Sequence, residues 1–169
     1  MLIDAENLRI VPFSERYIGA ELVGWLNDPQ LMRYSEQRHK VHDENTCARY
    51  ANSFAHSPHY YFALESTHPA PAFIGTMTVY QDCHNGVADI GILVGAARGK
   101  GYGREAWQAM LGWVQTALQP RKITAGTLSV NHPMLSIMKG SGMQADGLRK
   151  DHCVVDGHAV DVVYMAKFC

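Results

Sequence analysis

A cluster of glycines that joins a strand pattern to a helix pattern constrains the fold of this chain more than any other feature. Six of the 15 glycines lie within 18 consecutive positions, and they are Gly86, Gly91, Gly95, Gly99, Gly101 and Gly103. The cluster overlaps the apolar run Val87–Val94, and a helical spacing follows it at Ala106, Met110 and Trp113. Glycines expose successive backbone N–H groups, and the start of a helix adds positive potential. The sequence therefore predicts a strand–loop–helix unit that binds an anion.

Positive side chains flank the predicted loop. Arg98, Lys100 and Arg104 stand against one acid, Glu105, so three cations minus one acid give a local balance of +2 in a chain whose formal net charge is −1. A phosphate or pyrophosphate is the ligand that this arrangement favours. The alternative is that the glycines only form a tight turn between strand and helix.

Two well-known phosphate-binding patterns fit the loop poorly. A Walker P-loop needs Gly-x-x-x-x-Gly-Lys followed by Ser or Thr, but Val94 occupies its first glycine position and Gly101 follows Lys100. The dinucleotide pattern Gly-x-Gly-x-x-Gly/Ala does match Gly101–Ala106. However, no acid that could bind a ribose hydroxyl stands at the end of the next expected strand, 122–130. A dinucleotide-binding oxidoreductase stays open as the less favoured interpretation.

The periodicity along the chain predicts a mixed α+β fold. A strand at 8–13 precedes a helix capped by Ser14, and a second helix begins near Asp43. Hairpins then join three expected strands, and a helix, a strand, a short helix opened by Pro133 and two final strands follow. The expected ranges of the later elements are 60–65, 72–80, 87–94, 106–118, 122–130, 144–150 and 159–168, with a turn at Asp156-Gly157. We find no repeat or linker and expect one domain over residues 1–169.

Composition excludes several classes of protein. Near-neutral charge argues against a nucleic-acid partner, and the longest apolar run, 90–97, is too short to span a membrane. The four cysteines are widely spaced, and acids stand where a secretory signal has basic residues, so we expect a reduced, cytoplasmic protein. Among the nine histidines, His39 and His42 and likewise His56 and His59 are three residues apart, but both pairs lie in polar, loop-like sequence, so we expect no metal.

Two motifs give the chain a specific resemblance. Arg98–Gly103 matches the pattern Arg/Gln-x-x-Gly-x-Gly/Ala, and Asn131–Met143 is similar to a segment in which an Asn ends a strand before a short helix. With these motifs, almost the whole chain resembles the GCN5-related N-acetyltransferase (GNAT) family. Asp89-Ile-Gly-Ile-Leu together with Gly101–Ala106 looks most like the branch that acetylates ribosomal-protein N-termini.

The resemblance implies a mostly antiparallel central sheet that is splayed around acetyl-CoA, with helices on both faces. It implies that the loop wraps the cofactor's pyrophosphate while the preceding strand holds the pantetheine arm. The cofactor-binding residues that it implies are Ile92, Leu93, Val94, Arg98, Gly99, Lys100, Gly101, Tyr102, Gly103, Arg104 and Asn131.

The expected reaction is transfer of acetyl from acetyl-CoA to a primary amine of a small molecule or a protein N-terminus, by direct attack in a ternary complex. Backbone N–H groups of 92–94 would polarise the carbonyl, and Asp89 would act as base, directly or through a water. The alternative for Asp89 is a solvent-facing strand residue. We expect a monomer or a homodimer without nucleic-acid or membrane partners.

The chain departs from the family pattern where the leaving thiolate would be protonated. Many members of the family carry a Tyr at the position of Met138, and related branches carry a Ser at the position of Met134. Neither methionine can donate a proton. Ser136 is the candidate acid, with Tyr164 and solvent as alternatives. A non-catalytic CoA-binding sensor of the same fold is therefore a second hypothesis.

The resemblance places the acceptor pocket at the loop between the first two helices and at the last two strands. The candidate substrate contacts in that loop are Tyr34, Glu36 and Arg38. The alternative for these residues is an ordinary polar loop.

Overall fold

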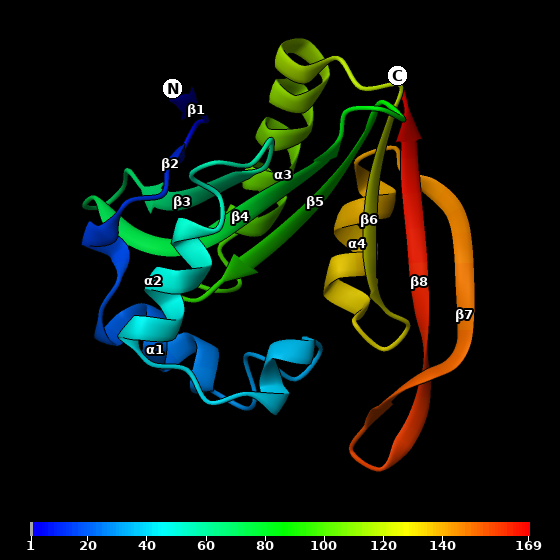
Figure 1. Ribbon diagram of the computed structural model, residues 1–169, viewed down its shortest axis with the longest axis horizontal. Coiled ribbons are helices and arrows are strands. Elements are labelled where there is room, and N and C mark those ends of the chain that lie inside the picture. Colours follow the sequence, from blue (N-terminus) through cyan, green and yellow to red (C-terminus); the bar gives the residue numbers. More distant parts are fainter. Residues whose placement is uncertain (1) are drawn as a thin grey trace.

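The computed structural model describes residues 2–169, which form an eight-stranded sheet with helices on both faces (Figure 1). The strands are β1 (Ile3–Asp4), β2 (Leu8–Pro12), β3 (Tyr60–Ser66), β4 (Ala72–Asp82), β5 (Val87–Val94), β6 (Lys122–Leu128), β7 (Gln144–Val155) and β8 (His158–Phe168). The α-helices are α1 (Ala20–Asn27), α2 (Glu44–Asn52), α3 (Tyr102–Trp113) and α4 (His132–Gly140). Two short 3-10 helices, η1 (Glu15–Tyr17) and η2 (Glu36–His39), and a π-helical turn, η3 (Val114–Leu118), complete the elements.

The sheet is antiparallel except where β5 meets β6. Its strand order is β1-β2-β3-β4-β5-β6-β8-β7, and the predicted hairpins join β3, β4 and β5. β5 pairs with β4 along its whole length, but it pairs with β6 only over 87–89, against 122–124. Beyond these residues the two strands diverge, as Figure 1 shows. The expected splayed, mostly antiparallel sheet with helices on both faces is confirmed.

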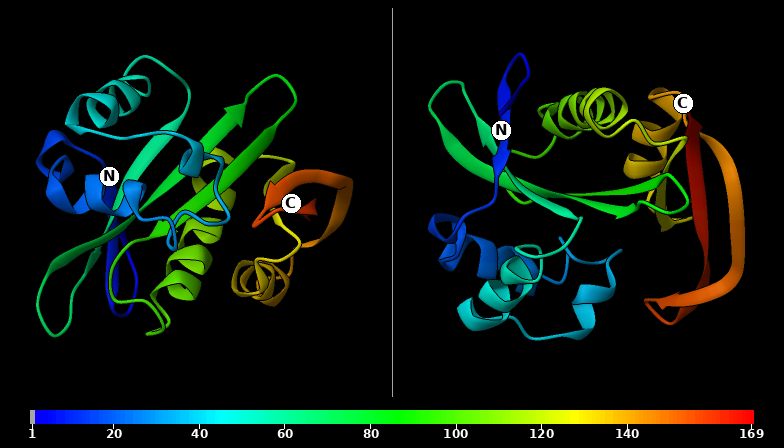
Figure 2. Two further views of the ribbon diagram at one scale, coloured as in Figure 1. Left: turned by 90° about the horizontal axis from the view of Figure 1, so that it is seen from below. Right: turned by 45° about the horizontal axis from the view of Figure 1, so that its top comes forward.

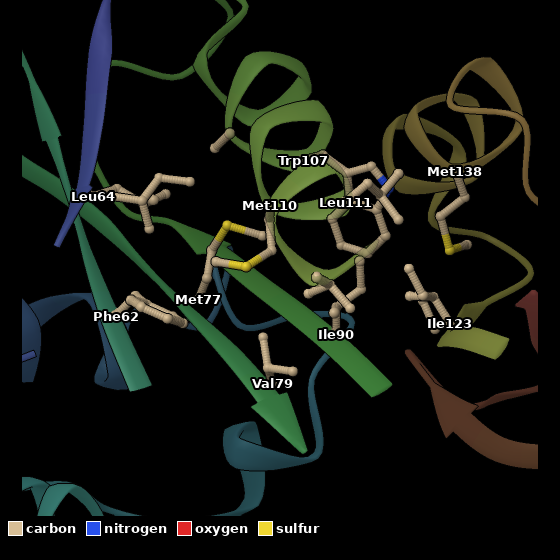
Figure 3. Packing of buried hydrophobic residues seen from close by; sticks show 14 of the residues in the cluster. Phe62, Leu64, Met77, Val79, Ile90, Trp107, Met110, Leu111, Ile123 and Met138 are labelled. Atoms are coloured by element: carbon tan, nitrogen blue, oxygen red, sulfur yellow. The ribbon is translucent and has the colours of Figure 1, made fainter. Parts of the chain in front are cut away.

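The main core lies between the sheet and α3. One stripe of α3, formed by Ala106, Trp107, Met110 and Leu111, is buried. Of the predicted helical spacing, Ala106 and Met110 are in this stripe, whereas Trp113 is only half-buried. Figure 3 shows Trp107, Met110 and Leu111 facing side chains of β3, β4, β5 and β6. The labelled sheet residues are Phe62, Leu64, Met77, Val79, Ile90 and Ile123. This packing fixes the position of the N-terminus of α3 next to the end of β5.

The opposite face of the sheet carries α1, α2 and η2 (Figure 2). Gly95 determines how closely α1 approaches, because a Cβ at this position would lie 2.0 Å from the Trp25 ring. α2 begins with a capping box, in which the Asp43 carboxylate accepts from the Thr46 N–H at 2.7 Å. The predicted start of the second helix is confirmed.

The first helix does not begin as the sequence predicts. Ser14 precedes only the three-residue η1 and its side chain makes no cap hydrogen bond, while α1 begins after Gly19. Ile18 is in an extended conformation, which interrupts the helical pattern between η1 and α1. The prediction of a Ser14 cap is therefore wrong. The helix expected at 106–118 starts earlier, at Tyr102. Gly101 is its N-cap, and Gly103 lies in its first turn.

The C-terminal hairpin has the predicted turn. Asp156 and Gly157 both have positive φ, +50° and +80°, as a two-residue hairpin turn of this hand requires. β7 extends five residues further than the expected 144–150, and its outer edge pairs with no other strand in residues 2–169. Within residues 2–169, no helix is long and apolar enough to cross a membrane.

Candidate functional site

The loop between β5 and α3 has a backbone conformation suited to an anion. Ala97, Gly99 and Gly101 have φ of +52°, +80° and +89°, whereas Arg98 and Lys100 between them have none in the left-handed region. This alternation turns successive N–H groups towards one concave side, a known anion-binding arrangement. A Cβ built on Gly99 or Gly101 would meet nothing within 4 Å, so the space beside the loop is open. The residues present therefore fit a pyrophosphate group.

The first turn of α3 adds to the positive potential of this loop. The Gly101 carbonyl accepts from the N–H groups of Arg104 and Glu105, at 3.0 and 3.1 Å, so the amides of the preceding residues form the free N-terminus of the helix. The Glu105 carboxylate accepts from the Asn7 backbone at 2.6 Å and from its side chain at 3.2 Å. The single acid near the loop is thus bound to β1–β2 and away from the loop.

The edge of β5 that faces the splay is unpaired beyond Asp89. The Gly95 N–H donates to the Ile74 carbonyl on the β4 side, at 2.9 Å. Because a strand directs alternate N–H groups to opposite neighbours, those of Ile92 and Val94 point into the gap that β6 leaves. These two amides are placed to bond an extended ligand.

A groove of about 990 Å³ runs along this edge. The loop and the end of β5 form one wall, and β6 and α4 form the other, with Thr127, Asn131 and Ser136. Asn131 caps α4 by accepting from the Met134 N–H at 3.4 Å, and its amide donates to Thr127 Oγ1 at 3.0 Å. The groove also contacts Arg98 and Arg104, but its lining does not include Lys100.

The structure brings the predicted cofactor residues together along the groove, but Tyr102 and Lys100 differ from the others in how they could contact a ligand. The lining includes Ile92, Leu93, Val94, Arg98, Gly99, Gly101, Tyr102, Gly103, Arg104 and Asn131. The Tyr102 side chain is buried and its hydroxyl donates to the His68 carbonyl at 3.0 Å, so only the backbone of this residue is available to a ligand. Lys100 is exposed beside the groove.

A second cavity of about 700 Å³ lies on the other face of the sheet, beneath α1, α2 and η2. Tyr61, Thr76, Thr78, Gly91 and Leu93 form its sheet side. The cavity and the groove share a wall, which consists of Met32, Ser35, Gly91, Ile92 and Leu93. Molecules bound on the two sides would thus meet at β5.

Gly91 keeps the shared wall thin. A Cβ at this position would lie 2.8 Å from Thr78 Oγ1, so any side chain here would displace a wall residue of the second cavity. Thr78 and Gly91 are direct partners in the β4–β5 register. The glycine therefore allows the two ligand spaces to approach each other closely.

Asp89 lies at the last residue pair before the splay. Its Oδ2 accepts from the Thr124 hydroxyl at 2.7 Å, and it faces Tyr80 across the β4–β5 ladder. Desolvation of the carboxyl by neighbouring groups raises its pKa, and the Thr124 hydrogen bond opposes this effect. Asp89 remains exposed and lines neither ligand space. It is two residues from Gly91, which corresponds to about 7 Å along a strand.

The groups near the expected thiolate position differ in exposure. Met134 and Ser136 line the groove, whereas Met138 is fully buried in the main core. Tyr164 packs against Gly126, and the Arg149 guanidinium lies 5.3 Å from its ring centre. Of the candidates for the acid, only Ser136 lines the groove.

The predicted acceptor contacts are separated in the structure. Tyr34 lines the groove, while Glu36 and Arg38 line neither ligand space. The Arg38 side chain is 14% exposed; it forms an ion pair with Glu36 at 3.0 Å and donates to the Val154 carbonyl at 3.0 Å. It therefore ties η2 to β7.

Sequence reasoning missed most of the second cavity. Met32 and Ser35 lie in the loop that was expected to contact substrate, but Thr76 and Thr78 carry no motif. The period of two in β4 was the available signal, because it places both threonines on the face away from α3. In residues 2–169, no cluster of three or more His, Cys, Asp or Glu side chains is arranged to hold a metal ion.

Comparisons with known proteins agree with this geometry. Residues 7–144 match the family model of the acetyltransferase (GNAT) domain. No curated protein matches the chain in a sequence search. Solved structures with the same fold include a GNAT acetyltransferase from Bacillus anthracis, with 23% identity, a TM-score of 0.82, and 99% of this chain and 98% of that chain covered.

Two further structures are similar to the chain. RimL, a ribosomal-protein α-N-acetyltransferase in complex with coenzyme A, has 14% identity, a TM-score of 0.83 and coverage of 99% and 98%. Spermidine N-acetyltransferase from Vibrio cholerae, in complex with CoA and spermine, has 18% identity, a TM-score of 0.82 and coverage of 96% and 95%. Since the family model spans most of the chain, and the loop, splayed sheet and groove agree with it, the protein belongs to the GNAT family of N-acetyltransferases, and the predicted use of acetyl-CoA is confirmed with it.

Proposed function

We propose that residues 1–169 act as one N-acetyltransferase domain that transfers acetyl from acetyl-CoA to a primary amine by direct attack in a ternary complex. The observation that carries the proposal is the shared wall at the β5 splay, where the groove and the second cavity meet. A ligand on each side would place a thioester and an amine close together, which is the main requirement for direct transfer.

The groove holds acetyl-CoA in this proposal. The N–H groups of 99–103 bind the pyrophosphate, with Arg98 and Arg104 beside it. The amides of Ile92 and Val94 bond the pantetheine arm and the thioester carbonyl. Acetyl-CoA supplies a thioester, whose thiolate is a good leaving group.

The acceptor amine occupies the second cavity. Its nitrogen attacks the thioester carbonyl, a C–N bond forms, the C–S bond breaks, and the nitrogen loses one proton while the thiolate gains one. Asp89 takes the amine proton through a water, because it is too far from Gly91 for direct contact. Ser136 or solvent returns a proton to the thiolate, since Met134 and Met138 cannot.

The acceptor is a small-molecule amine or a peptide N-terminus. The similar structures point to both classes, because RimL acts on a ribosomal protein and the Vibrio cholerae enzyme on spermidine. We also propose that the protein acts in the cytoplasm, as a monomer or homodimer.

A panel of amines tests the proposal. The protein is mixed with acetyl-CoA and with amino acids, peptides, amino sugars or polyamines, and thiol release is followed with a chromogenic disulfide. Release that depends on the amine supports acetyl transfer. Acetyl-CoA binding without release for any amine would support the sensor alternative, and binding of NADH in place of acetyl-CoA would contradict both. The only parallel strand pair within residues 2–169 is β5–β6, which does not favour a doubly wound dinucleotide fold.

A further inference from the structure

The second cavity, here called the acceptor cavity, has no carboxylate in its wall. None of the residues that line it is an Asp or a Glu, and apart from the Gln37 amide its side chains are apolar, aromatic, hydroxylic or basic. A polycation bound here would find no ionised partner, which argues against a polyamine acceptor.

Two acids that neighbour lining residues in the sequence are engaged elsewhere. Glu36 pairs with Arg38 at 3.0 Å, and the Asp43 carboxylate accepts from the Thr46 N–H as the cap of α2. Capping lowers the pKa of Asp43, so this carboxylate stays charged at the start of the helix. Neither acid contributes to the cavity lining.

Two cations of the lining form no direct ion pair, although the Arg49 charge helps to lower the pKa of Asp43. Lys40 follows η2 and Arg49 lies on α2, and both are exposed. Within residues 2–169 neither side chain forms an ion pair or a side-chain hydrogen bond. Neither cation belongs to the wall shared with the groove. The two cations therefore line the cavity away from the shared wall, while an amine would react at the shared wall, near Gly91.

Apolar surface occupies much of the remaining wall. Leu22, Met32 and Cys47 are buried, and the Tyr61 ring stacks on Phe54 with centroids 5.2 Å apart. Hydroxyl groups of Thr76 and Thr78 lie on the sheet side. A ligand with an apolar or aromatic body would be matched to this surface, with a few polar contacts.

We propose that the preferred acceptor is a primary amine that also carries an anionic group, such as a carboxylate, on an apolar or aromatic body. This proposal rests on the function proposed above. The amine lies at the shared wall near Gly91, and the anionic group lies against Lys40 and Arg49.

The lack of a carboxylate in the wall favours the reactive form of the amine. No wall carboxylate stabilises an ammonium ion, and the apolar residues Met32, Ile92 and Leu93 of the shared wall disfavour the charged form. Because only the neutral amine attacks a thioester, the cavity would reduce the demand on Asp89 as a base. This agrees with a carboxylate that lies outside both ligand spaces.

Matched peptides test the proposal. Alanyl-phenylalanine and alanyl-phenylalaninamide share the same amine and aromatic group and differ in the terminal charge, while spermidine serves as the polycation. We expect kcat/KM to be about tenfold or more higher for the acid than for the amide, the equivalent of one charge-assisted hydrogen bond. Spermidine should be the poorest of the three. The preference for the acid should decrease as salt is added.

The double variant Lys40→Gln/Arg49→Gln should reduce the acid-to-amide ratio to near one, with the loss mostly in KM and with acetyl-CoA affinity unchanged. The control Lys139→Gln/Lys150→Gln removes the same charge from exposed positions outside both ligand spaces and should keep the ratio. A wild-type enzyme that acetylates the amide or spermidine as fast as the acid would overturn the acceptor class alone. Absence of transfer to every amine would overturn the proposed function and this inference with it.

Discussion

At the scale of single residues, the positive φ values of the loop are the feature closest to function. Gly99 and Gly101 adopt a left-handed conformation next to open space. A side chain is unfavourable there for two reasons: it would strain the backbone, and it would occupy the space that the ligand needs. The sequence made this loop predictable, because glycines at alternate positions have few other uses. It could not reveal that Ala97 shares the conformation, since Ala has no preference for positive φ.

A substitution at Gly101 separates these two effects. In Gly101→Val, strain should lower the free energy of unfolding by about 1–2 kcal/mol, and the side chain should also occupy the pyrophosphate space. Gly157→Val is the control, because Gly157 has a similar φ of +80° and equally open surroundings in the β7–β8 turn. We expect both variants to lose stability in thermal melts, but only Gly101→Val to lose acetyl-CoA affinity, by tenfold or more in calorimetry. Equal affinities would remove the loop from the account.

The Asp89 carboxylate is predicted to lower the stability of the folded state and to raise turnover. Desolvation raises its pKa in the folded state, so the folded state disfavours the carboxylate. The associated loss of stability is absent below the unfolded pKa and develops as pH rises through the folded pKa. Asp89→Asn should therefore melt higher than the wild type at pH 7 to 8, with the difference vanishing in acid.

The same variant should lower kcat and flatten its rise with pH, because Asn cannot accept the amine proton. Asp151→Asn, at an exposed position of β7 outside both ligand spaces, should keep the wild-type profile. If Asp89→Asn kept the wild-type pH profile, Asp89 would be an ordinary strand residue and the base would have to be sought elsewhere.

At the scale of elements, the strands were easier to predict than the helix boundaries. The expected 87–94 coincides with β5, although burial alternates only over its first half and residues 91–94 are all half-buried. The helix after Ser14 was misplaced because a capping residue and an apolar stripe do not show the extended Ile18 between them. The splay of β5 from β6 had no signal in the residues; only the family resemblance predicted it, since strand separation is a tertiary feature.

η2 provides a test of how one element is held. Arg38 joins it to β7 through the Val154 carbonyl, although the sequence suggested a substrate contact. Arg38→Met should cost about 1–3 kcal/mol, because the Val154 and Ser35 carbonyls lose a mostly buried, charged donor. Arg33→Met removes the exposed Arg33–Asp156 pair between the loop before η2 and the β7–β8 turn, and it should cost less than about 1 kcal/mol.

Arg38→Met should also raise the KM for the amine and speed amide exchange at 32–42, because Met32 and Ser35 belong to the shared wall. Acetyl-CoA affinity should change little. A change in acetyl-CoA affinity without a change in amine KM would show that this loop serves the groove and not the acceptor cavity.

At the scale of the whole molecule, the arrangement of layers explains why the site lies at β5. α3 occupies one face of the sheet and α1, α2 and η2 occupy the other, so a ligand from either side can reach the strand where the sheet opens (Figure 2). The fold class and the cofactor loop were predictable from local patterns. The acceptor cavity was not, because its wall is assembled from α1, the loop that contains η2, α2, β3, β4 and β5.

The central claim is that acetyl-CoA binds along the open edge of β5 and at the start of α3. The most direct measurement is an NMR titration of the ¹⁵N-labelled protein with acetyl-CoA, with NADH as the comparison ligand. We expect the largest amide shifts at Ile92, Val94 and 99–103, with small shifts at β7 and its turn. Shifts centred outside the groove, or the same response to NADH, would contradict this claim.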